Sequence, residues 1–333
     1  MILVTGGTGL VGAHLLLYLI ESENTGPRKI RAIYRNSETI KKTESLFQLY
    51  NKSTLFNAIE WVEGDIIDIP TLEHAFKGID YVYHSAALIS FDPKDESVVR
   101  KTNIEGTANI VNFCLAKGVK KLCYISSTAA LGDLTSTATI ITEETEWNPE
   151  KPHSDYAISK YGAEMEIWRG QQEGLDVIIV NPGVIIGPGF QEQGSGLLFK
   201  AVAKGLRYYT LGKTGFVAVS DVVRMAVELM KSEIRNKRFV LIGQNISFRD
   251  ILNTIADALN VKKPSRHMQP YLMEIGWRVD WILANIFNKK RKLTRATAKA
   301  SYSKHDYSNE KIKTTLKTDF TDVHQYIKEI SSL

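Results

Sequence analysis

The feature that most constrains this 333-residue chain is a glycine-rich turn directly after its first apolar segment. Residues 2–5 read Ile-Leu-Val-Thr, and residues 9–21 carry apolar side chains at helical spacing, so the turn joins a predicted strand to a predicted helix. Glycines three residues apart let the backbone approach a pyrophosphate resting on the helix N-terminus. The turn therefore predicts a dinucleotide site. Its expected contacts are Gly6, Thr8, Gly9, Leu10, Val11 and Gly12.

Short β-branched runs alternate with helical patterns up to about residue 186. The predicted strands cover residues 2–5, 30–35, 59–63, 81–84, 121–126 and 177–181, and the predicted helices include 9–21, 98–117 and 155–171. The strands lack polar alternation, which is typical of strands covered by helices on both faces. This alternation predicts an α/β fold: a Rossmann-type, doubly wound parallel sheet with a smaller, mostly helical C-terminal substrate lobe.

The alternation changes after Pro188, where a glycine-rich loop leads to a predicted helix at 197–204 and a strand at 216–219. We expect Asp221 to cap a helix at 222–230, a strand at 238–242, and Ser247 to cap a further helix. We therefore assign residues 1–186, with about 214–243, to a nucleotide-binding domain. Residues 187–213 and 244–333 would form a discontinuous substrate-binding lobe.

The end of the second predicted strand indicates which dinucleotide binds. NAD-preferring sites place an acidic residue there for the ribose 2′-hydroxyl, whereas this strand ends at Arg35 and no acid occurs before Glu38. A guanidinium suits a 2′-phosphate. We therefore predict NADP with Arg35 as its contact. The alternatives are NAD as the cofactor and a plain surface role for Arg35.

Residues at the ends of the next two strands are further candidates for the cofactor site. Asp65 and Ile66 follow the third strand, where the adenine ring would lie, although an aspartate there can equally close a turn. Ala86 and Ala87 follow the fourth strand, and their small side chains would let the cofactor lie close to the backbone.

Tyr156 and Lys160 are one turn apart in the predicted helix 155–171, so they share a face. An ammonium beside a phenol lowers the phenol pKa, which suits proton exchange with a carbonyl or alcohol oxygen. The spacing is common, and a solvated helix face is the alternative. Ser127 and Thr128 follow the fifth strand at the carboxyl edge of the sheet, where α/β proteins bind ligands. We expect Ser127 to hold the substrate oxygen.

Pro182 and Gly183 end the sixth strand at the same edge. We expect Pro182 to contact the cofactor, and Thr128 and Gly183 to contact the substrate together with Ser127 and Tyr156.

Several motifs occur in one order along the chain, and together they resemble the extended short-chain dehydrogenases/reductases, the NAD-dependent epimerase/dehydratase superfamily. They are the Gly6–Gly12 turn, Gly64-Asp65-Ile66, His84-Ser85-Ala86-Ala87, Asn103, Glu105-Gly106-Thr107, Ser126-Ser127, Tyr156 with Lys160, and Asn181-Pro182-Gly183. Within that family the chain most resembles dihydroflavonol-4-reductase-like and 3β-hydroxysteroid-dehydrogenase-like members. The features behind this are Arg35 after Tyr34 and the segment 182–188.

The resemblance implies specific roles. Ser127, Tyr156 and Lys160 would form the catalytic triad, with Ser127 preferred to Ser126 by its spacing to Gly132. Lys160 would also contact the nicotinamide ribose. Asn103 would support a proton relay, with a helix-packing asparagine as the alternative. Relatives often form homodimers through the helices that carry Asn103 and Tyr156.

These residues predict an NADP-dependent oxidoreductase that interconverts a carbonyl and a secondary alcohol on a hydrophobic or ring-bearing small molecule. One alternative is a nucleotide-sugar epimerase with tightly bound NAD. Another is a non-catalytic protein that senses the dinucleotide. Dehydration is disfavoured, because Thr128-Ala129-Ala130 stands where sugar dehydratases usually carry Thr-Asp-Glu.

The C-terminal part combines apolar and basic character. Residues 271–287 place Leu272, Ile275, Val279, Ile282 and Ile286 on one helix face, and Lys289-Lys290-Arg291-Lys292 follow. We expect a lid helix packed on the substrate lobe. The alternative is a helix lying on a membrane surface.

Composition and the lengths of the apolar runs exclude several classes of protein. Two cysteines are too few for a disulfide framework, and the histidines lack metal-ligand spacing, so we expect no metal site. The apolar runs are too short for an integral membrane segment, and the first strand leaves no room for a signal peptide. We expect a cytoplasmic protein that binds a small molecule and no nucleic acid.

Overall fold

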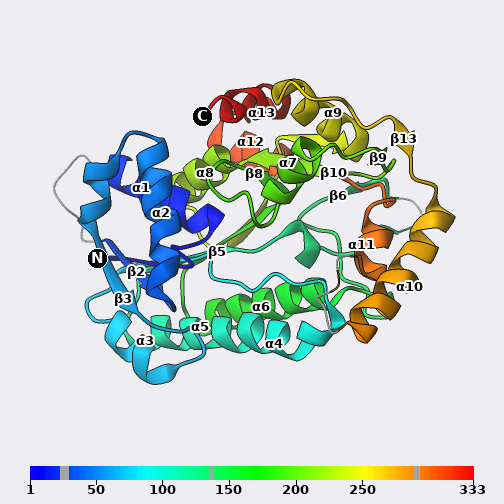
Figure 1. Cartoon of the computed structure of the whole chain (residues 1–333). Helices are drawn as coiled ribbons and strands as arrows, with labels where there is room; N and C mark the ends of the chain where they lie inside the picture. The colour runs from blue at the N-terminus through cyan, green and yellow to red at the C-terminus, as the bar shows by residue number, and fades with distance from the viewer. Residues whose placement is uncertain (23–29, 136–137, 288–290, 292) are drawn as a thin grey trace.

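The chain folds around a seven-stranded parallel sheet, as the computed structural model shows for residues 1–22, 30–135, 138–287, 291 and 293–333 (Figure 1). The strand order is β11-β7-β5-β4-β1-β2-β3. The strands are β1 (Ile2–Thr5), β2 (Ile30–Tyr34), β3 (Ile59–Glu63), β4 (Tyr81–His84), β5 (Lys121–Ile125), β7 (Val177–Pro182) and β11 (Lys237–Leu241). The order reverses direction between β1 and β4, the place where such sheets bind ligands at their carboxyl ends.

Helices cover both faces of this sheet, as predicted. One face is covered by α1 (Leu10–Ser22), α2 (Ile40–Leu49) and α8 (Val219–Lys231), and the other by α3 (Ile69–Ala75), α5 (Gly106–Ala116) and α6 (Asp155–Gln172). Along β1, Ile2 and Val4 pack into the first core while Leu3 packs into the second. Successive strand residues point to opposite faces, so both sides of a central strand must be apolar.

A smaller sheet of β8 (Val184–Ile186), β10 (Lys213–Ala218) and β12 (Gln244–Ser247) lies beside the main one. The C-terminal part is mainly helical. It contains α9 (Phe248–Ala258), α10 (Pro270–Ile286), α11 (Arg295–Ala300), α12 (Glu310–Leu316) and α13 (Val323–Ser331). The remaining short elements are α4 (Glu96–Arg100), α7 (Gly196–Ala203), β6 (Ile140–Ile141), β9 (Tyr208–Tyr209), β13 (Arg266–His267) and β14 (Asp306–Tyr307). The proposed domain boundaries remain a prediction.

Three local predictions were wrong in part. The predicted helix 98–117 is divided by a π-helical turn, Lys101–Glu105, between α4 and α5. Asp221 is no N-cap, because α8 already begins at Val219; its carboxylate instead accepts the Thr321 N–H at 2.8 Å and pairs with Arg224. Ser247 does cap α9, since its hydroxyl accepts the Asp250 N–H.

The third difference concerns α10, which was expected to pack as a lid. Its predicted apolar face is exposed, and Ala284 is its buried residue. Within the part of the chain that the structure describes, no helix combines the length and apolar character needed to cross a membrane.

Candidate active site

The glycine-rich turn between β1 and α1 is tight, and its backbone leaves little room for side chains. Gly6 has a φ of 72°, and its carbonyl oxygen accepts the Gly9 N–H at 3.0 Å. A Cβ at Gly12 would lie 2.1 Å from that oxygen, which only glycine avoids. At Gly9, by contrast, the nearest atom to a Cβ would be 3.5 Å away, so this position is open. The first turn of α1, all of whose residues the structure describes, contains no acidic residue. An anion can therefore approach the N-terminus of α1.

The other residues predicted for this turn lie beside it. Thr8 is half-buried, and Leu10 and Val11 start α1 and pack against the first core. The backbone of Ala86 lies directly against Gly6, whose Cβ would be 2.6 Å from the Ala86 nitrogen. Thus the structure brings the ends of the first and fourth strands together, with Ala87 next in the same loop. The cofactor contacts of Ala86 and Ala87 stay a prediction.

Arg35 and Asp65 meet at the ends of β2 and β3. Their charged groups are 3.7 Å apart, and the Arg35 side chain is 61% exposed. Asp65 also closes a turn, because its carboxylate accepts the Ile67 N–H at 3.1 Å. Ile66 is buried under Gly106. Arg35 therefore has solvent access for an anion, while Asp65 offsets part of its charge.

Tyr156 lies in the first turn of α6, which begins where the Ser154 hydroxyl accepts the Ala157 N–H. Burial raises the pKa of the Tyr156 phenol, and its hydrogen bond with Ser127 lowers that pKa in part. Ser127 itself accepts the Ala129 N–H at 3.1 Å. The structure thus joins the predicted tyrosine and serine, with Thr128 beside them, and keeps the phenol protonated at neutral pH.

Lys160, one turn after Tyr156, is buried and bonded to β5. Its ammonium donates to the Tyr124 hydroxyl at 3.1 Å and to the Ile125 carbonyl at 3.0 Å. Burial lowers the pKa of Lys160 to about 7, and the Glu164 carboxylate opposes this. Burial is the larger influence on the phenol pKa, and the lowering of that pKa by Lys160 stays a prediction.

A buried chain of polar groups links Lys160 to the glycine turn. Tyr124 hydrogen-bonds Thr107, which contacts His84 Nε2 at 3.0 Å, and His84 Nδ1 contacts the Thr5 hydroxyl at 2.7 Å. Burial, with Lys160 nearby, lowers the pKa of His84 to about 3, so the imidazole is neutral. Of these side chains, only Lys160 was predicted to have a role, because polar residues that face a core carry no local sign of their partners.

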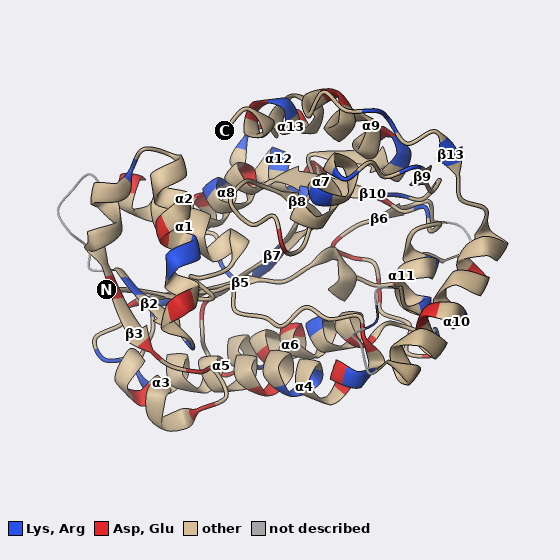
Figure 2. Ribbon diagram, in the orientation of Figure 1, with Lys and Arg blue, Asp and Glu red and all other residues tan. Residues whose placement is uncertain are grey.

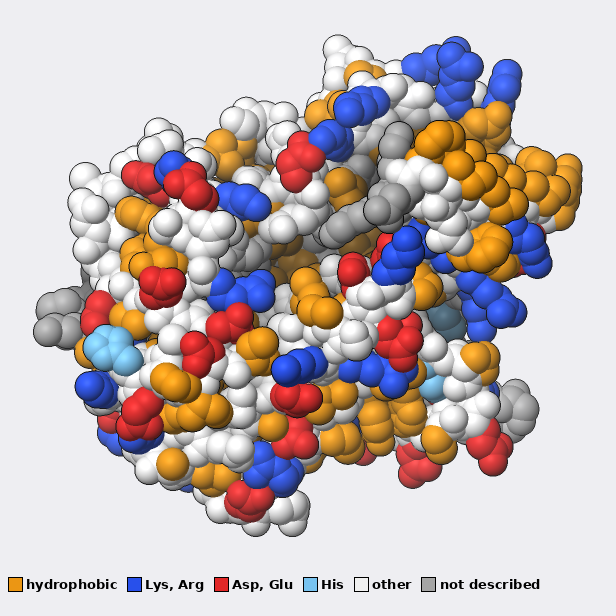
Figure 3. Space-filling view, turned by 60° about the horizontal axis from the view of Figure 1, so that its bottom comes forward, with side chains coloured by type: hydrophobic (Ala, Val, Ile, Leu, Met, Phe, Trp, Pro, Cys, Tyr) orange, Lys and Arg blue, Asp and Glu red, His pale blue; other side chains and the backbone are white. Residues whose placement is uncertain are grey.

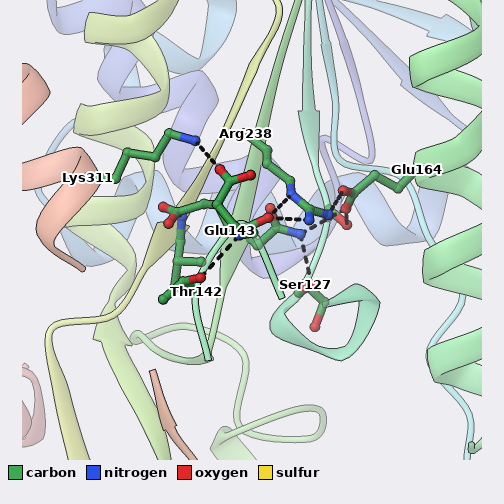
Figure 4. Close-up of polar contacts among 10 residues, drawn as sticks. Ser127, Thr142, Glu143, Glu164, Arg238 and Lys311 are labelled. Atoms are coloured by element: carbon green, nitrogen blue, oxygen red, sulfur yellow. Dashed lines mark hydrogen bonds and ion pairs between the residues drawn. The ribbon is translucent and has the colours of Figure 1, made fainter. Parts of the chain in front are cut away.

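A second missed feature is an ionic network at the end of β5 and β7 (Figure 4). Glu164 is fully buried and accepts hydrogen bonds from Ser126, Asn181 and Arg238. Asn181 also donates to the Ser127 carbonyl at 3.1 Å, and Arg238 reaches the Glu143 carbonyl. This network fixes the strand end that presents Ser127. The signal available in the sequence was the position of Glu164 one turn after Lys160.

Asn103, placed by the π-helical turn, is almost fully buried. Its amide accepts the Leu88 N–H at 2.7 Å and donates to the Leu88 carbonyl and the Ser159 hydroxyl. These contacts hold the loop after β4 onto α6. The part of Asn103 in a proton relay stays a prediction.

Pro182 and Gly183 lie at the edge of β7, as expected. A Cβ at Gly183 would come within 2.3 Å of the Gly215 carbonyl, so this glycine lets the chain between β7 and β8 pass close to β10. Its contact with substrate, like the cofactor contact of Pro182, stays a prediction. Cys114 and Cys123 are both buried and free, and burial raises the pKa of each thiol. Among described residues no group of His, Cys, Asp or Glu could hold a metal ion.

The residues present fit a nicotinamide dinucleotide. The open Gly9 position and the N-terminus of α1 would hold the pyrophosphate, and the exposed Arg35 would meet the adenosine ribose. Tyr156 and Ser127 lie at the same carboxyl edge, where the nicotinamide would reach.

Comparisons with known proteins identify relatives of this chain. The chain is 28% identical over 274 residues to sterol demethylase protein B of Methylococcus capsulatus, covering 82% of this chain and 78% of that protein. It is 26% identical over 344 residues to dihydroflavonol 4-reductase of Arabidopsis thaliana, covering 99% and 86%. Among solved structures, gox2253 is 25% identical with a TM-score of 0.80, covering 100% of this chain and 97% of that one.

UDP-glucose 4-epimerase of Thermotoga maritima has a TM-score of 0.76 at 19% identity, covering 99% of this chain and 97% of that one, a likeness of fold alone. The family model described as the NAD dependent epimerase/dehydratase family matches residues 2–243. The chain therefore belongs to the NAD-dependent epimerase/dehydratase family, the extended short-chain dehydrogenases/reductases.

Proposed function

We propose that this protein is an NADP-dependent oxidoreductase that interconverts a carbonyl and a secondary alcohol on a hydrophobic or ring-bearing small molecule. The observation that supports this most is the hydrogen-bonded pair of Tyr156 and Ser127 at the carboxyl edge of the sheet, one helical turn from Lys160. Named relatives that are reductases, such as the Arabidopsis dihydroflavonol 4-reductase, support the same class of reaction.

In the reducing direction Tyr156 is the proton donor. Burial keeps its phenol protonated, so the proton is available to the substrate oxygen as negative charge develops there. The Ser127 hydroxyl donates a hydrogen bond to the same oxygen and orients it. Lys160 stabilises the phenolate left behind, from its position one turn along α6. Bound NADPH supplies the hydride.

The loop after β4 supports an apolar substrate. The ring of Phe91 meets that of Tyr156 edge-on, with 5.5 Å between ring centres, and Ile89 and Phe91 are both exposed. Aromatic and aliphatic side chains beside the proton donor favour a ring-bearing molecule over a small acid.

A pair of binding titrations tests the cofactor. We expect NADPH to bind at least about tenfold more tightly than NADH, and Arg35→Ala to abolish that difference. The matched control Arg207→Ala removes another exposed arginine and should leave the preference unchanged. Equal affinity for both cofactors in the wild type would contradict the NADP assignment. The purified protein should then consume NADPH with ketones or aldehydes, and binding without any turnover would point to a sensing role.

A second candidate is a nucleotide-sugar epimerase. Two observations favour it: the family model carries that name, and Asp65 offsets part of the charge of Arg35. An epimerase would retain NAD that does not exchange, and it would invert a sugar carbon with no net change of cofactor. Freely exchanging NADPH contradicts this candidate.

We also propose that the protein is a homodimer through the helical segment that carries Asn103, which α4 begins, and through α6, which carries Tyr156. Val98 and Met165 on these helices are exposed apolar residues, which supports a partner there. Sedimentation velocity should give twice the chain mass, and Met165→Glu should give a monomer.

A further inference from the structure

Helix α10 exposes an unusual amount of apolar surface. Tyr271, Ile275, Trp281, Ile286 and the following Phe287 are each more than half exposed. Figure 3 shows hydrophobic side chains gathered at the right-hand end of the molecule, where Figure 1 places α10, with basic side chains above and below them. Contiguous apolar surface of this kind marks a place where something binds.

The orientation of α10 is fixed by polar contacts on its inner side. The Asp280 carboxylate accepts the Leu293 N–H at 3.2 Å, and the Arg291 guanidinium donates to the Trp277 carbonyl at 3.2 Å. Ala284, on the same side as Asp280, is buried. The opposite face carries Ile275 and Ile286 outward. The exposure of this face therefore follows from how the helix is attached.

The sequence around α10 is strongly basic. Residues 281–305 contain seven Lys or Arg and no Asp or Glu, and Lys262, Lys263 and Arg266 precede the helix. Figure 2 shows basic residues on β13, which leads into α10. On α11, Arg295 and Lys299 are both exposed. A helix with an apolar face and flanking basic residues is complementary to a surface that carries negative charge outside and apolar groups beneath it.

We propose that α10 is a docking helix that lies on an anionic lipid surface, with its apolar face in the acyl boundary and the flanking basic residues at the lipid headgroups. The helix is too short and too polar on its inner side to span a bilayer, so it lies in the plane of the membrane. The charge distribution favours lipid over a second copy of this chain, because a second copy would bring the same positive charge.

Vesicle sedimentation tests the proposal. The full-length protein is mixed with vesicles of phosphatidylcholine alone, or of phosphatidylcholine with one third phosphatidylglycerol. We expect binding to the anionic vesicles at least about tenfold stronger than to the neutral ones, and weaker binding as salt is raised. Equal or absent binding to the two vesicle types would overturn the proposal.

Variants separate the apolar and the basic contributions. The double change Ile275→Glu with Ile286→Glu should lower vesicle binding at least about tenfold at any salt concentration. Ile69→Glu is the matched control, because Ile69 is also about half exposed but begins α3, at the other end of the molecule. Arg295→Gln with Lys299→Gln should weaken binding and flatten its salt dependence.

The fold and the oligomeric state are checked alongside. All four changed positions are exposed, so the circular dichroism spectrum and thermal unfolding should be unchanged. If α10 were covered by a second copy, Ile275→Glu with Ile286→Glu would convert an oligomer to a smaller species in sedimentation velocity without lipid. That result, or vesicle binding equal to the wild type, would overturn the assignment.

Discussion

Helices α6 and α10 are nearly equal in length, 18 and 17 residues. They differ in burial: α6 buries charged side chains, whereas α10 exposes apolar ones. Helix α6 buries Lys160 and Glu164, while α10 exposes Ile275 and Ile286. A buried charge is costly unless it has partners, and on α6 each charge has them. An exposed apolar face is stable only if something covers it or if it serves binding. In this protein the buried charges of α6 lie at the candidate active site, and the exposed apolar face of α10 is the candidate docking surface.

One of the two largest expected losses of stability follows from breaking the ionic network on α6. Glu164→Ala leaves the Arg238 guanidinium and the Asn181 amide without their carboxylate, so we expect the free energy of unfolding to fall by about 3 kcal/mol. Glu166→Ala on the same helix removes an ion pair nearer the surface and should cost less than about 1 kcal/mol. Urea denaturation measures both, and equal losses would contradict the contrast.

A matched pair of isoleucines compares the two helices directly. Ile167 on α6 is fully buried, and Ile167→Ala should cost about 3 kcal/mol through lost burial and a cavity. Ile282 on α10 is 47% exposed, and Ile282→Ala should change stability by less than about 0.5 kcal/mol. A comparable loss at Ile282 in denaturant titrations would show that α10 packs as a lid after all.

The burial of Lys160 on α6 should make the free energy of unfolding depend on pH. Its pKa is about 7 in the folded protein against an ordinary 10.5, so the unfolded chain binds more protons between these values. Stability therefore rises with pH across that window, by at most about 1.4 kcal/mol per pH unit. Lys160→Met should remove this rise, so the difference between wild type and variant grows from pH 7 to 9. Parallel stability curves would show that Lys160 is not desolvated.

The smallest effect concerns the hydroxyl of Tyr124. Tyr124→Phe removes one of the acceptors of the Lys160 ammonium while keeping the ring, so we expect a loss of about 1 kcal/mol in unfolding free energy. The midpoint at which Lys160 titrates in the stability curve should also shift. An unchanged curve would mean that the buried polar chain does not hold Lys160.

Local patterns predicted most of the sheet because strand and helix periods are local properties. The boundaries of β1, β3 and β4 agree with the predicted strands. The glycine turn, Tyr156 and Ser127 could be proposed from the sequence because their chemistry is visible within a few residues. Glu164 was missed because its partner Arg238 is 74 residues away. The apolar stripe of α10 correctly predicted a helix, but the prediction that this stripe packs on the substrate lobe was wrong. Periodicity shows which side chains share a helix face, but not whether another element covers that face.

The central claim is that the buried polar face of α6 performs proton transfer, and one substitution tests it most directly. With NADPH and an accepted ketone, Tyr156→Phe should slow turnover by at least about 100-fold while cofactor binding stays within about twofold. Tyr161→Phe, on the same helix and stacked on Trp147, should retain full turnover. Full turnover by Tyr156→Phe would contradict the account.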